Sequence, residues 1–342
     1  EGFRDVARTK IMVFYPRDGV SDVQKLQMMT QGGGNVGVLS VKGNFDDAQN
    51  GVKEIFSDGR LREALETRGW FLSSANSINW GRLLPQIVYY VSAYCDLYRR
   101  GAISAGQEIN FCVPTGNFGN ILAGYYAKKL GLPIKTLICA SNRNDVLTDF
   151  INTGVYDRNR AFFTTLSPSM DILVSSNLER LLFDLSGADD ALTASYMRAL
   201  GDGGRYEANA EIRAAVARDF ACGCLDDERT KKTIAEVFKT GYLIDTHTAV
   251  AYGVLNDYRA RTGDAAPAVV VSTASPFKFC DSVLDALGQP SAAPGLELID
   301  ALAAFSGAEA PKQLRALRGK RVRFDGAAEK SGMRAAVEDF LK

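Results

Sequence analysis

The sequence predicts an α/β protein with two open parallel sheets, one in each of two domains. Three observations support this class. Short apolar runs alternate with helical periods along most of the chain. The 342 residues are enough for about two domains. One strand also enters a glycine-rich turn that opens directly into a helix. Such alternation is typical of parallel sheets covered by helices.

The start of the chain contains two strand–helix units. The apolar runs 10–16 and 35–43 predict buried strands, because they do not alternate with polar residues. Helices are expected at 21–33, with Ser21 as N-cap, and at 44–59. These units predict a small parallel-sheet module.

A larger sheet is expected further along. Residues 79–101 keep the three-to-four spacing of a long helix, with Pro85 in its first turn or at a kink. Residues 108–116 and 134–142 predict two buried strands joined through a helix. This βαβ crossover favours a second open sheet.

The remaining segments complete the second sheet. Residues 247–263 predict a helix, 267–275 a strand and 276–288 a helix. Residues 155–240 have helical periods, many charges and no strong strand, so they predict a helical insertion. Residues 291–342 predict a C-terminal helical tail.

The expected domain division follows from these elements. Residues 1–72 are expected to belong to a small α/β domain. Residues 73–342 are expected to form the large domain, which carries the insertion and the tail.

Composition excludes several functions. Lys plus Arg and Asp plus Glu each number 40, so the net charge gives no reason to expect nucleic acid or an anionic membrane as partner. No apolar run approaches the length of a membrane span, and we expect a cytoplasmic protein. One histidine and scattered cysteines argue against a zinc site, and the thiols are expected to be reduced.

The turn in "CVPTGNFGNILAGYY" is suited to an anion. Gly116 and Gly119 allow a close approach to backbone N–H groups at the positive end of a helix, and Asn117 and Asn120 can add donors. The pattern is neither G-x-G-x-x-G nor a P-loop. The turn therefore predicts a site for a ligand's phosphate, or else a tight β–α turn with asparagine in left-handed geometry.

A second anion-suited helix start lies at Asn76, Ser77, Asn79 and Arg82. Asn76 and Ser77 offer N-cap-like groups, and Arg82 can bind a phosphate or carboxylate with two donors. The alternative is a well-capped helix with a surface arginine.

Hydroxyl groups end the strand expected at 267–275. Ser272, Thr273 and Ser275 lie where ligands bind in open sheets.

Several motifs together resemble threonine synthase, a pyridoxal-phosphate enzyme of the tryptophan synthase β-like family, in its longer bacterial and fungal form. They are "FYPRDGVSDVQKLQM" (14–28), "SANSINWGRLLPQ" (74–86), "GNFGN" (116–120), "DTHTAVAYGV" (245–254) and "STASPFKF" (272–279). The resemblance implies the two-domain open-sheet fold of that family, with pyridoxal 5'-phosphate as cofactor.

The resemblance also implies roles for individual residues. Thr273 would contact the pyridine nitrogen, and Asn76, Ser77 and Arg82 would hold the substrate phosphate. The cofactor phosphate would be held by Gly116, Asn117, Phe118, Gly119 and Asn120. The implied reaction converts O-phospho-L-homoserine and water to L-threonine and phosphate. Two alternatives remain, a threonine-synthase-like phospho-lyase and a non-catalytic protein that binds pyridoxal phosphate or a phospho-amino acid.

Two segments expected from the family do not occur in the sequence. The Schiff-base lysine segment H-G-P-T-x-x-F-K-D and the substrate loop S-G-D-T-G are both missing. We therefore expect a truncated enzyme with no catalytic residue in this chain, inactive as given. Lys278 is the nearest candidate substitute, and its family counterpart has another place in the site.

His247, the only histidine, begins a helix in "DTHTAV", and we interpret it as structural. The expected partner is a small-molecule substrate. A monomer is expected, and a dimer stays open.

Overall fold

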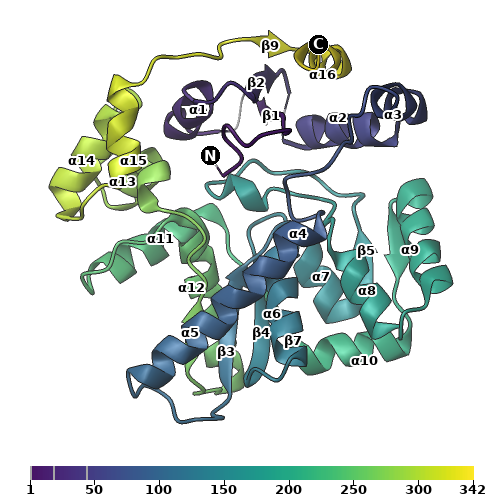
Figure 1. The fold of residues 1–342 in the computed structure, drawn as a ribbon. Coiled ribbons are helices and arrows are strands. Elements are labelled where there is room, and N and C mark those ends of the chain that lie inside the picture. Colours follow the sequence, from purple (N-terminus) through teal and green to yellow (C-terminus); the bar gives the residue numbers. More distant parts are fainter. Residues whose placement is uncertain (1, 18–19, 44) are drawn as a thin grey trace. The chain divides into compact units, whose positions relative to one another are not determined.

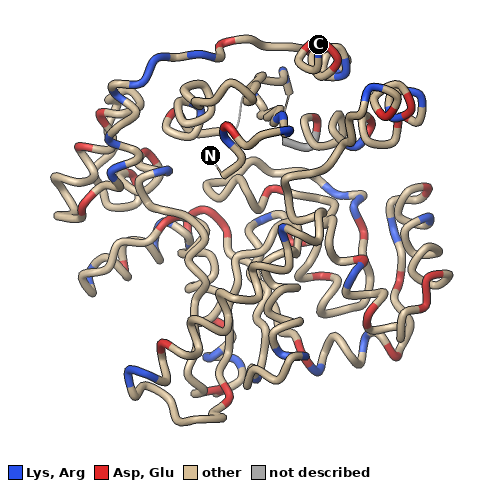
Figure 2. Tube along the Cα trace, viewed as in Figure 1, with Lys and Arg blue, Asp and Glu red and all other residues tan. Residues whose placement is uncertain are grey.

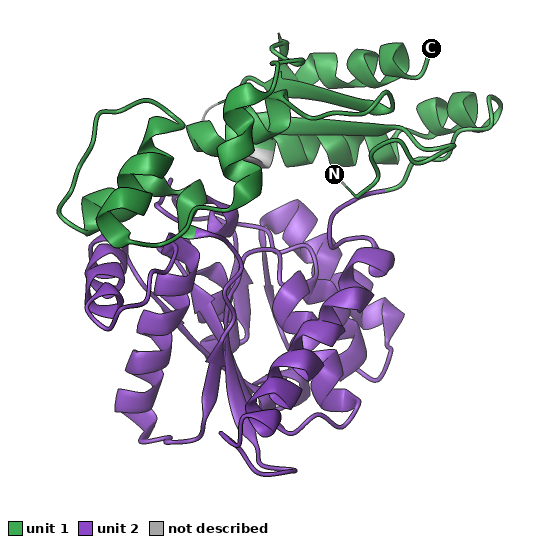
Figure 3. Ribbon diagram, turned by 60° about the vertical axis from the view of Figure 1, so that its left-hand side comes forward, with its two compact units in different colours: residues 1–73, 276–342 green, residues 74–275 purple. Residues whose placement is uncertain are grey.

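The computed structural model describes residues 2–17, 20–43 and 45–342, and the chain divides into two compact units (Figure 3). Unit 1 combines both ends of the chain, up to residue 73 and from residue 276, and unit 2 comprises residues 74–275. Both units are α/β with parallel sheets, which confirms the predicted class (Figure 1). Basic and acidic residues are interspersed along both units (Figure 2).

Unit 1 contains a three-stranded parallel sheet in the order β1-β2-β9. Its strands are β1 (Ile11–Pro16), β2 (Val36–Val41) and β9 (Ala327–Ala328). Its α-helices are α1 (Asp22–Met29), α2 (Phe45–Ser57), α3 (Gly59–Glu66), α13 (Cys280–Ala286), α14 (Glu297–Ser306), α15 (Lys312–Arg315) and α16 (Met333–Phe340). Ser21 caps α1 in a capping box with Gln24, as its sequence position predicts. The expected start of the second helix, Asn44, lies outside the described residues.

The end of the chain completes the core of unit 1. Met333, Val337 and Leu341 from the α16 region are buried in one cluster with Val41 and Leu61. The sequence analysis assigns residues 276–342 to the large domain, and the structure instead packs them with the first 73 residues. For residues 333–341 the physical reason is this shared apolar cluster, which sequence spacing does not reveal.

Unit 2 contains a four-stranded parallel sheet in the order β7-β4-β3-β8. The strands are β3 (Ile109–Pro114), β4 (Ile134–Ser141), β7 (Phe220–Cys224) and β8 (Ala268–Val270). Every residue of β3 is buried, as expected for a central parallel strand. A separate antiparallel pair joins β5 (Val155–Asp157) to β6 (Arg205–Glu207).

The α-helices of unit 2 pack around two apolar clusters of the sheet, one that includes Phe111, Leu122 and Leu137 and another in which Cys112 and Ile138 meet Val250 of α12. They are α4 (Trp80–Leu83), α5 (Ile87–Arg99), α6 (Gly119–Lys129), α7 (Val146–Thr153), α8 (Leu178–Leu185), α9 (Asp190–Gly203), α10 (Ala210–Asp219), α11 (Asp227–Phe238) and α12 (Thr246–Thr262).

The prediction of a purely helical insertion at 155–240 is wrong. The segment contains α8 to α11, but it also contributes β7 to the main sheet, with Phe220 opposite Leu137. β7 follows α10 without an intervening turn residue, so no sequence signal separates the strand from the helix.

Two further elements are shorter than expected. The helix predicted at 79–101 is divided into α4, a 3₁₀ turn (Leu84–Gln86) and α5, because Pro85 lacks the N–H that a continuous helix requires. The strand predicted at 267–275 ends at Val270. This places Ser272 and Thr273 in the loop that follows β8.

Candidate functional site

The candidate site lies at the carboxyl edge of the unit 2 sheet. β3 ends at Pro114 and β8 at Val270, and Val270 is paired with Cys112 of β3. Because these strands are parallel, the loops that follow them leave the sheet at the same edge. That edge is where ligands bind in open α/β sheets.

The loop between β3 and α6 presents a row of backbone donors. Within the described part of the chain, the N–H groups of residues 116–121 donate to no acceptor, and the first bond of the helix runs from Leu122 to the carbonyl oxygen of Phe118. A helix start leaves such groups unsatisfied and carries positive partial charge. The row is therefore suited to a phosphate, as the sequence predicts.

Phe118 gives this turn its shape. It adopts a left-handed conformation with φ of 62°, which the sequence analysis considers for an asparagine of the turn and the structure gives to Phe118. Left-handed geometry costs a non-glycine residue about 1–2 kcal/mol. The buried Phe118 ring, which packs on Phe220 at 5.8 Å between centroids, offsets this by about 1.5–3 kcal/mol.

The two glycines of the turn are required by packing against the protein itself. A Cβ on Gly116 would lie 2.5 Å from the carbonyl oxygen of Ser169. A Cβ on Gly119 would lie 2.6 Å from both Cβ and Oγ of Ser77. Gly119 therefore brings the two predicted phosphate loops into direct contact, a role that differs from the approach of a ligand expected from sequence.

The two asparagines of the turn contact protein groups. Tyr90 donates its hydroxyl hydrogen toward Oδ1 of Asn120, at 2.7 Å, which ties α6 to α5. Burial raises the pKa of Tyr90, so this hydroxyl stays a donor. The side-chain oxygen of Asn117 accepts from Ser176 at 3.3 Å.

The second loop is held by its own polar side chains. The side chain of Asn76 accepts from Ile78 N–H at 3.0 Å, and Asn79 caps α4 by accepting from Gly81 N–H at 2.9 Å. The cap of this helix is therefore Asn79, and the N-cap-like residues Asn76 and Ser77 precede it. Arg82, in α4, is exposed and donates to the carbonyl oxygen of Ala75 at 2.8 Å.

The sequence analysis misses the segment that joins these two loops, residues 175–180 at the start of α8. Ser175 donates to the carbonyl oxygen of Gly116 at 2.9 Å. Asn177 donates to the carbonyl oxygen of Asn117 at 2.8 Å and to Oγ of Ser77 at 3.0 Å. Arg180 donates to the carbonyl oxygens of Ser77 and Ile78. The run Ser-Ser-Asn before an apolar helix is an N-cap signal, but nothing local indicates its partners.

Thr273 is exposed, three residues beyond the end of β8. The neighbouring Ser272 is tied to the start of α12, because its Oγ lies 3.1 Å from Oγ1 of Thr248. Thr248 in turn donates to the buried carboxylate of Asp245, which caps α12. The loop that carries Thr273 is thus anchored to α12.

His247 is buried in the same cluster, with Nδ1 3.0 Å from Oδ1 of Asp245. Its position inside the start of α12 agrees with the structural interpretation. Lys278, the candidate substitute for the missing lysine, lies in unit 1 at the end of the 3₁₀ turn Pro276–Lys278.

Four of the cysteines, Cys112, Cys139, Cys222 and Cys280, are buried, and Cys95 and Cys224 are exposed. All six are free, and burial raises the pKa of Cys139 to about 12 and that of Cys222 to about 11. Among the described residues, no group of three or more His, Cys, Asp or Glu side chains is arranged to hold a metal ion. In the same part of the chain, no helix combines the length and apolar character needed to span a membrane.

The fold and these loops define a two-unit α/β protein with a phosphate-suited sheet edge, and comparisons with known proteins specify it further. A family model described as "Threonine synthase, C-terminal" matches residues 248–340. Threonine synthase-like 1 of Homo sapiens is 43% identical over 83% of this chain and 38% of its own length. Threonine synthase of Pseudomonas aeruginosa is 41% identical over 86% of this chain and 60% of its own length.

A solved structure agrees over almost the whole chain. Threonine synthase from Brucella melitensis, with pyridoxal phosphate bound, superposes with a TM-score of 0.81 and is 37% identical, covering 99% of this chain and 67% of that one. The chain belongs to the threonine synthase family. It spans 38% to 60% of the length of the two curated relatives above.

Proposed function

We propose that the protein is a threonine synthase, with pyridoxal phosphate as cofactor, that converts O-phospho-L-homoserine and water to L-threonine and phosphate. The observation that carries the proposal is the contact between two anion-suited loops at Gly119 and Ser77. Cofactor and substrate each bring one phosphate group, and the unit offers one loop for each. The relatives named threonine synthase support the same reaction.

The cofactor would be held at the end of β3. Residues 116–121 would donate their backbone N–H groups to its phosphate, and the hydroxyl of Thr273 would bond its ring nitrogen. When bound, the cofactor supplies an electron sink for charge that develops on the substrate carbons. With a hydroxyl partner such as Thr273 at its nitrogen, the cofactor ring withdraws electrons less strongly than it would with a carboxylate partner.

The substrate phosphate would be held by the second loop. Ser77 and Asn76 provide neutral polar groups, and Arg82 adds a positive charge. Arg82 uses one donor on the carbonyl oxygen of Ala75, so further N–H groups of its guanidinium can bind an anion. No carboxylate forms an ion pair with Arg82 among the described residues, and its charge is available to the ligand.

Replacement of Arg82 tests this assignment. In the whole protein, Arg82→Ala is expected to raise the KM for O-phosphohomoserine about tenfold or more, because a charge-assisted hydrogen bond contributes about 1.5–3 kcal/mol. The cofactor absorbance spectrum should stay unchanged. Arg198→Ala, which removes an exposed arginine of α9, is the matched control. Unchanged KM and kcat in Arg82→Ala would remove this residue from the site.

A phospho-lyase outcome is the second candidate, and the similarity to a relative that is not named plainly as a threonine synthase keeps it open. The chain is as similar to a protein named Threonine synthase-like 1 as to the bacterial threonine synthase. Incubating the whole protein with O-phosphohomoserine and separating threonine from 2-oxobutyrate distinguishes the two. Threonine as the main product supports the synthase, and 2-oxobutyrate without threonine supports the lyase.

The lysines of this chain provide a separate test. Borohydride treatment of residues 1–342 with pyridoxal phosphate should give no single stoichiometric lysine adduct, because no lysine lies in a matched Schiff-base motif. Mass mapping of the digest measures this. One stoichiometric adduct, for example on Lys278, together with turnover, would show that the chain carries its own amine.

A further inference from the structure

Asn177 occupies the N-cap position of α8 without capping it. Its side chain accepts no hydrogen bond from a backbone N–H of that helix's first turn, whereas Asn209 caps α10 and Asp226 caps α11 with their side chains. A capping bond is normally stabilising, and Asn177 forgoes it. Its amide is committed to the two loops of the site instead.

The geometry around Asn177 fixes the orientation of its amide. Nδ2 lies 3.0 Å from Oγ of Ser77 and 2.8 Å from the carbonyl oxygen of Asn117, and Oδ1 accepts from Arg180. A carbonyl oxygen can only accept, so the NH₂ group must face Asn117, and the guanidinium must face Oδ1. The side chain is fully buried, and its three bonds use both donors and the acceptor.

This orientation determines what Ser77 can offer a ligand. A serine hydroxyl has one hydrogen and two lone pairs. Since Oγ of Ser77 accepts from Asn177, its hydrogen is left to donate, and within the described part of the chain it has no acceptor. The side chain is only partly buried. Ser77 therefore presents a donor to a ligand oxygen.

Arg180 holds the same loop from its backbone side. Its guanidinium donates to the carbonyl oxygens of Ser77, at 3.0 Å, and of Ile78. Among the described residues no carboxylate forms an ion pair with Arg180, so its positive charge is balanced only by neutral oxygens. This charge lies beside two loops whose hydrogen-bond donors lack acceptors, so it favours an anionic ligand.

We propose that Asn177 and Arg180 are positioning residues for the substrate phosphate, and that they act through Ser77. Asn177 makes Ser77 a donor and ties its loop to the cofactor loop, while Arg180 fixes the loop backbone. The proposal rests on the proposed function, because it takes the ligand of Ser77 to be the phosphate monoester of the substrate.

The test is a double-mutant cycle in the whole protein, loaded with pyridoxal phosphate, with O-phospho-L-homoserine binding measured by calorimetry. Ser77→Ala and Asn177→Asp are each expected to weaken binding about tenfold. Because Asn177 acts through Ser77, Asn177→Asp should weaken binding less than threefold further once Ser77 is alanine. A purely structural role for Asn177 would not produce this dependence on Ser77.

Asn209→Asp is the matched control, since it makes the same substitution at the N-cap of α10. It is expected to bind like the unmodified protein. If Asn177→Asp does not fold, Arg180→Lys replaces it, because lysine keeps the charge but cannot hold two carbonyl oxygens in a fork. It should weaken binding about threefold to tenfold, and its effect should also disappear in the Ser77→Ala background.

The outcomes separate the two proposals. If Ser77→Ala and Arg82→Ala both bind normally, the substrate-phosphate assignment fails. If Ser77→Ala weakens binding but Asn177→Asp does not, or if the two effects multiply in full, the assignment of Asn177 is overturned. Normal binding by Arg180→Lys overturns the assignment of Arg180.

Discussion

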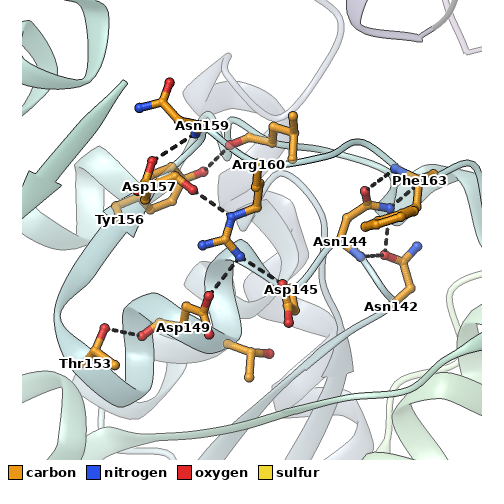
Figure 4. Close-up of polar contacts among 12 residues, drawn as sticks. Asn142, Asn144, Asp145, Asp149, Thr153, Tyr156, Asp157, Asn159, Arg160 and Phe163 are labelled. Carbon is orange, nitrogen blue, oxygen red and sulfur yellow. Dashed lines mark hydrogen bonds and ion pairs between the residues drawn. The ribbon is translucent and has the colours of Figure 1, made fainter. Parts of the chain in front are cut away.

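The loops that follow β3 and β4 leave the same edge of one sheet, yet they treat their polar groups in opposite ways. After β3, the N–H groups of residues 116–121 have no acceptor in the described part of the chain. After β4, side chains take up the backbone groups: Asn142 accepts from Asn144 N–H, and Asn144 accepts from Phe163 N–H, each at 2.9 Å (Figure 4).

The same contrast holds for charge. Arg160, which follows β5, pairs with Asp145 at the end of the loop after β4, at 2.9 Å, and with Asp149 of α7, at 2.8 Å (Figure 4). Beside the loop after β3, Arg82 and Arg180 donate to uncharged oxygens. The loop after β4 therefore pairs its own polar groups and supports the fold. The loop after β3 keeps donors and positive charge available for a ligand.

The largest expected effect is in the ligand loop. Gly119→Asp should abolish retention of pyridoxal phosphate, because its Cβ would collide with Ser77 and its carboxylate would repel the phosphate. Absorbance after dialysis of the whole protein measures this. Gly201→Asp in α9, where a Cβ meets nothing within 4 Å, is the control. Normal retention by Gly119→Asp would refute the cofactor-loop assignment.

In the loop after β4, a substitution should change stability and leave ligand binding unchanged. Asn142→Ala removes the group that lies 2.7 Å from Oδ1 of Asp171 and 2.8 Å from Thr165. The change removes one donor from the buried Asp171 carboxylate and leaves the Asn144 N–H without its acceptor, which costs about 1–3 kcal/mol. Denaturant unfolding should show this loss in the free energy of unfolding. The affinity for the phosphate-bearing ligands of the site should stay within about twofold. A large loss of affinity at full stability would place this loop in the ligand site.

A smaller loss of stability is expected from Arg160→Met. The substitution keeps part of the apolar stem and removes both ion pairs, whose partners Asp145 and Asp149 are partly exposed. Such pairs contribute about 1 kcal/mol or less, and salt weakens them. Unfolding at low and high salt should therefore show a difference that shrinks as salt is added. A loss that is independent of salt would contradict the ion-pair explanation.

The smallest effect concerns pH. Burial raises the pKa of the Asp171 carboxyl, although bonds from Thr165 and Asn142 oppose the shift. The folded protein then holds a proton that the unfolded chain has released, so stability falls as pH rises upward from the ordinary value of about 3.9. Asp171→Asn should flatten this slope in unfolding experiments across that range. If the slope of stability against pH is unchanged in this variant, the pH dependence comes from another titratable group.

Local features of the sequence were sufficient for much of the site. The strand, glycine turn and helix at residues 109–129 follow from apolar runs and turn chemistry, and the suitability for a phosphate follows from helix-start physics. The role of Gly119 did not follow, because the atom that excludes its Cβ belongs to Ser77, 42 positions away in the sequence.

What sequence could not predict depends on long-range contacts. Asn177 and Arg180 lie 100 or more positions from Ser77, and no periodicity links them. β7 was missed because a five-residue strand directly after a helix has no boundary signal. The position of residues 333–341 depended on an apolar cluster formed by both ends of the chain. The site-residue roles themselves stay predictions until the experiments above are made.

Unit 1 is built from both ends of the chain, and this has a consequence for the protein during synthesis. β2 acquires its neighbour β9, and the apolar cluster that contains Leu61 acquires Met333, Val337 and Leu341, only after residues 327–341 have left the ribosome. At about 5–20 residues per second, residues 74–275 alone take roughly 10–40 s to make. Unit 2 is contiguous and has all its strands by residue 270, so it can fold first. Throughout that interval the nascent residues 2–73 have an incomplete apolar core, so we expect this segment to need protection from aggregation until synthesis ends.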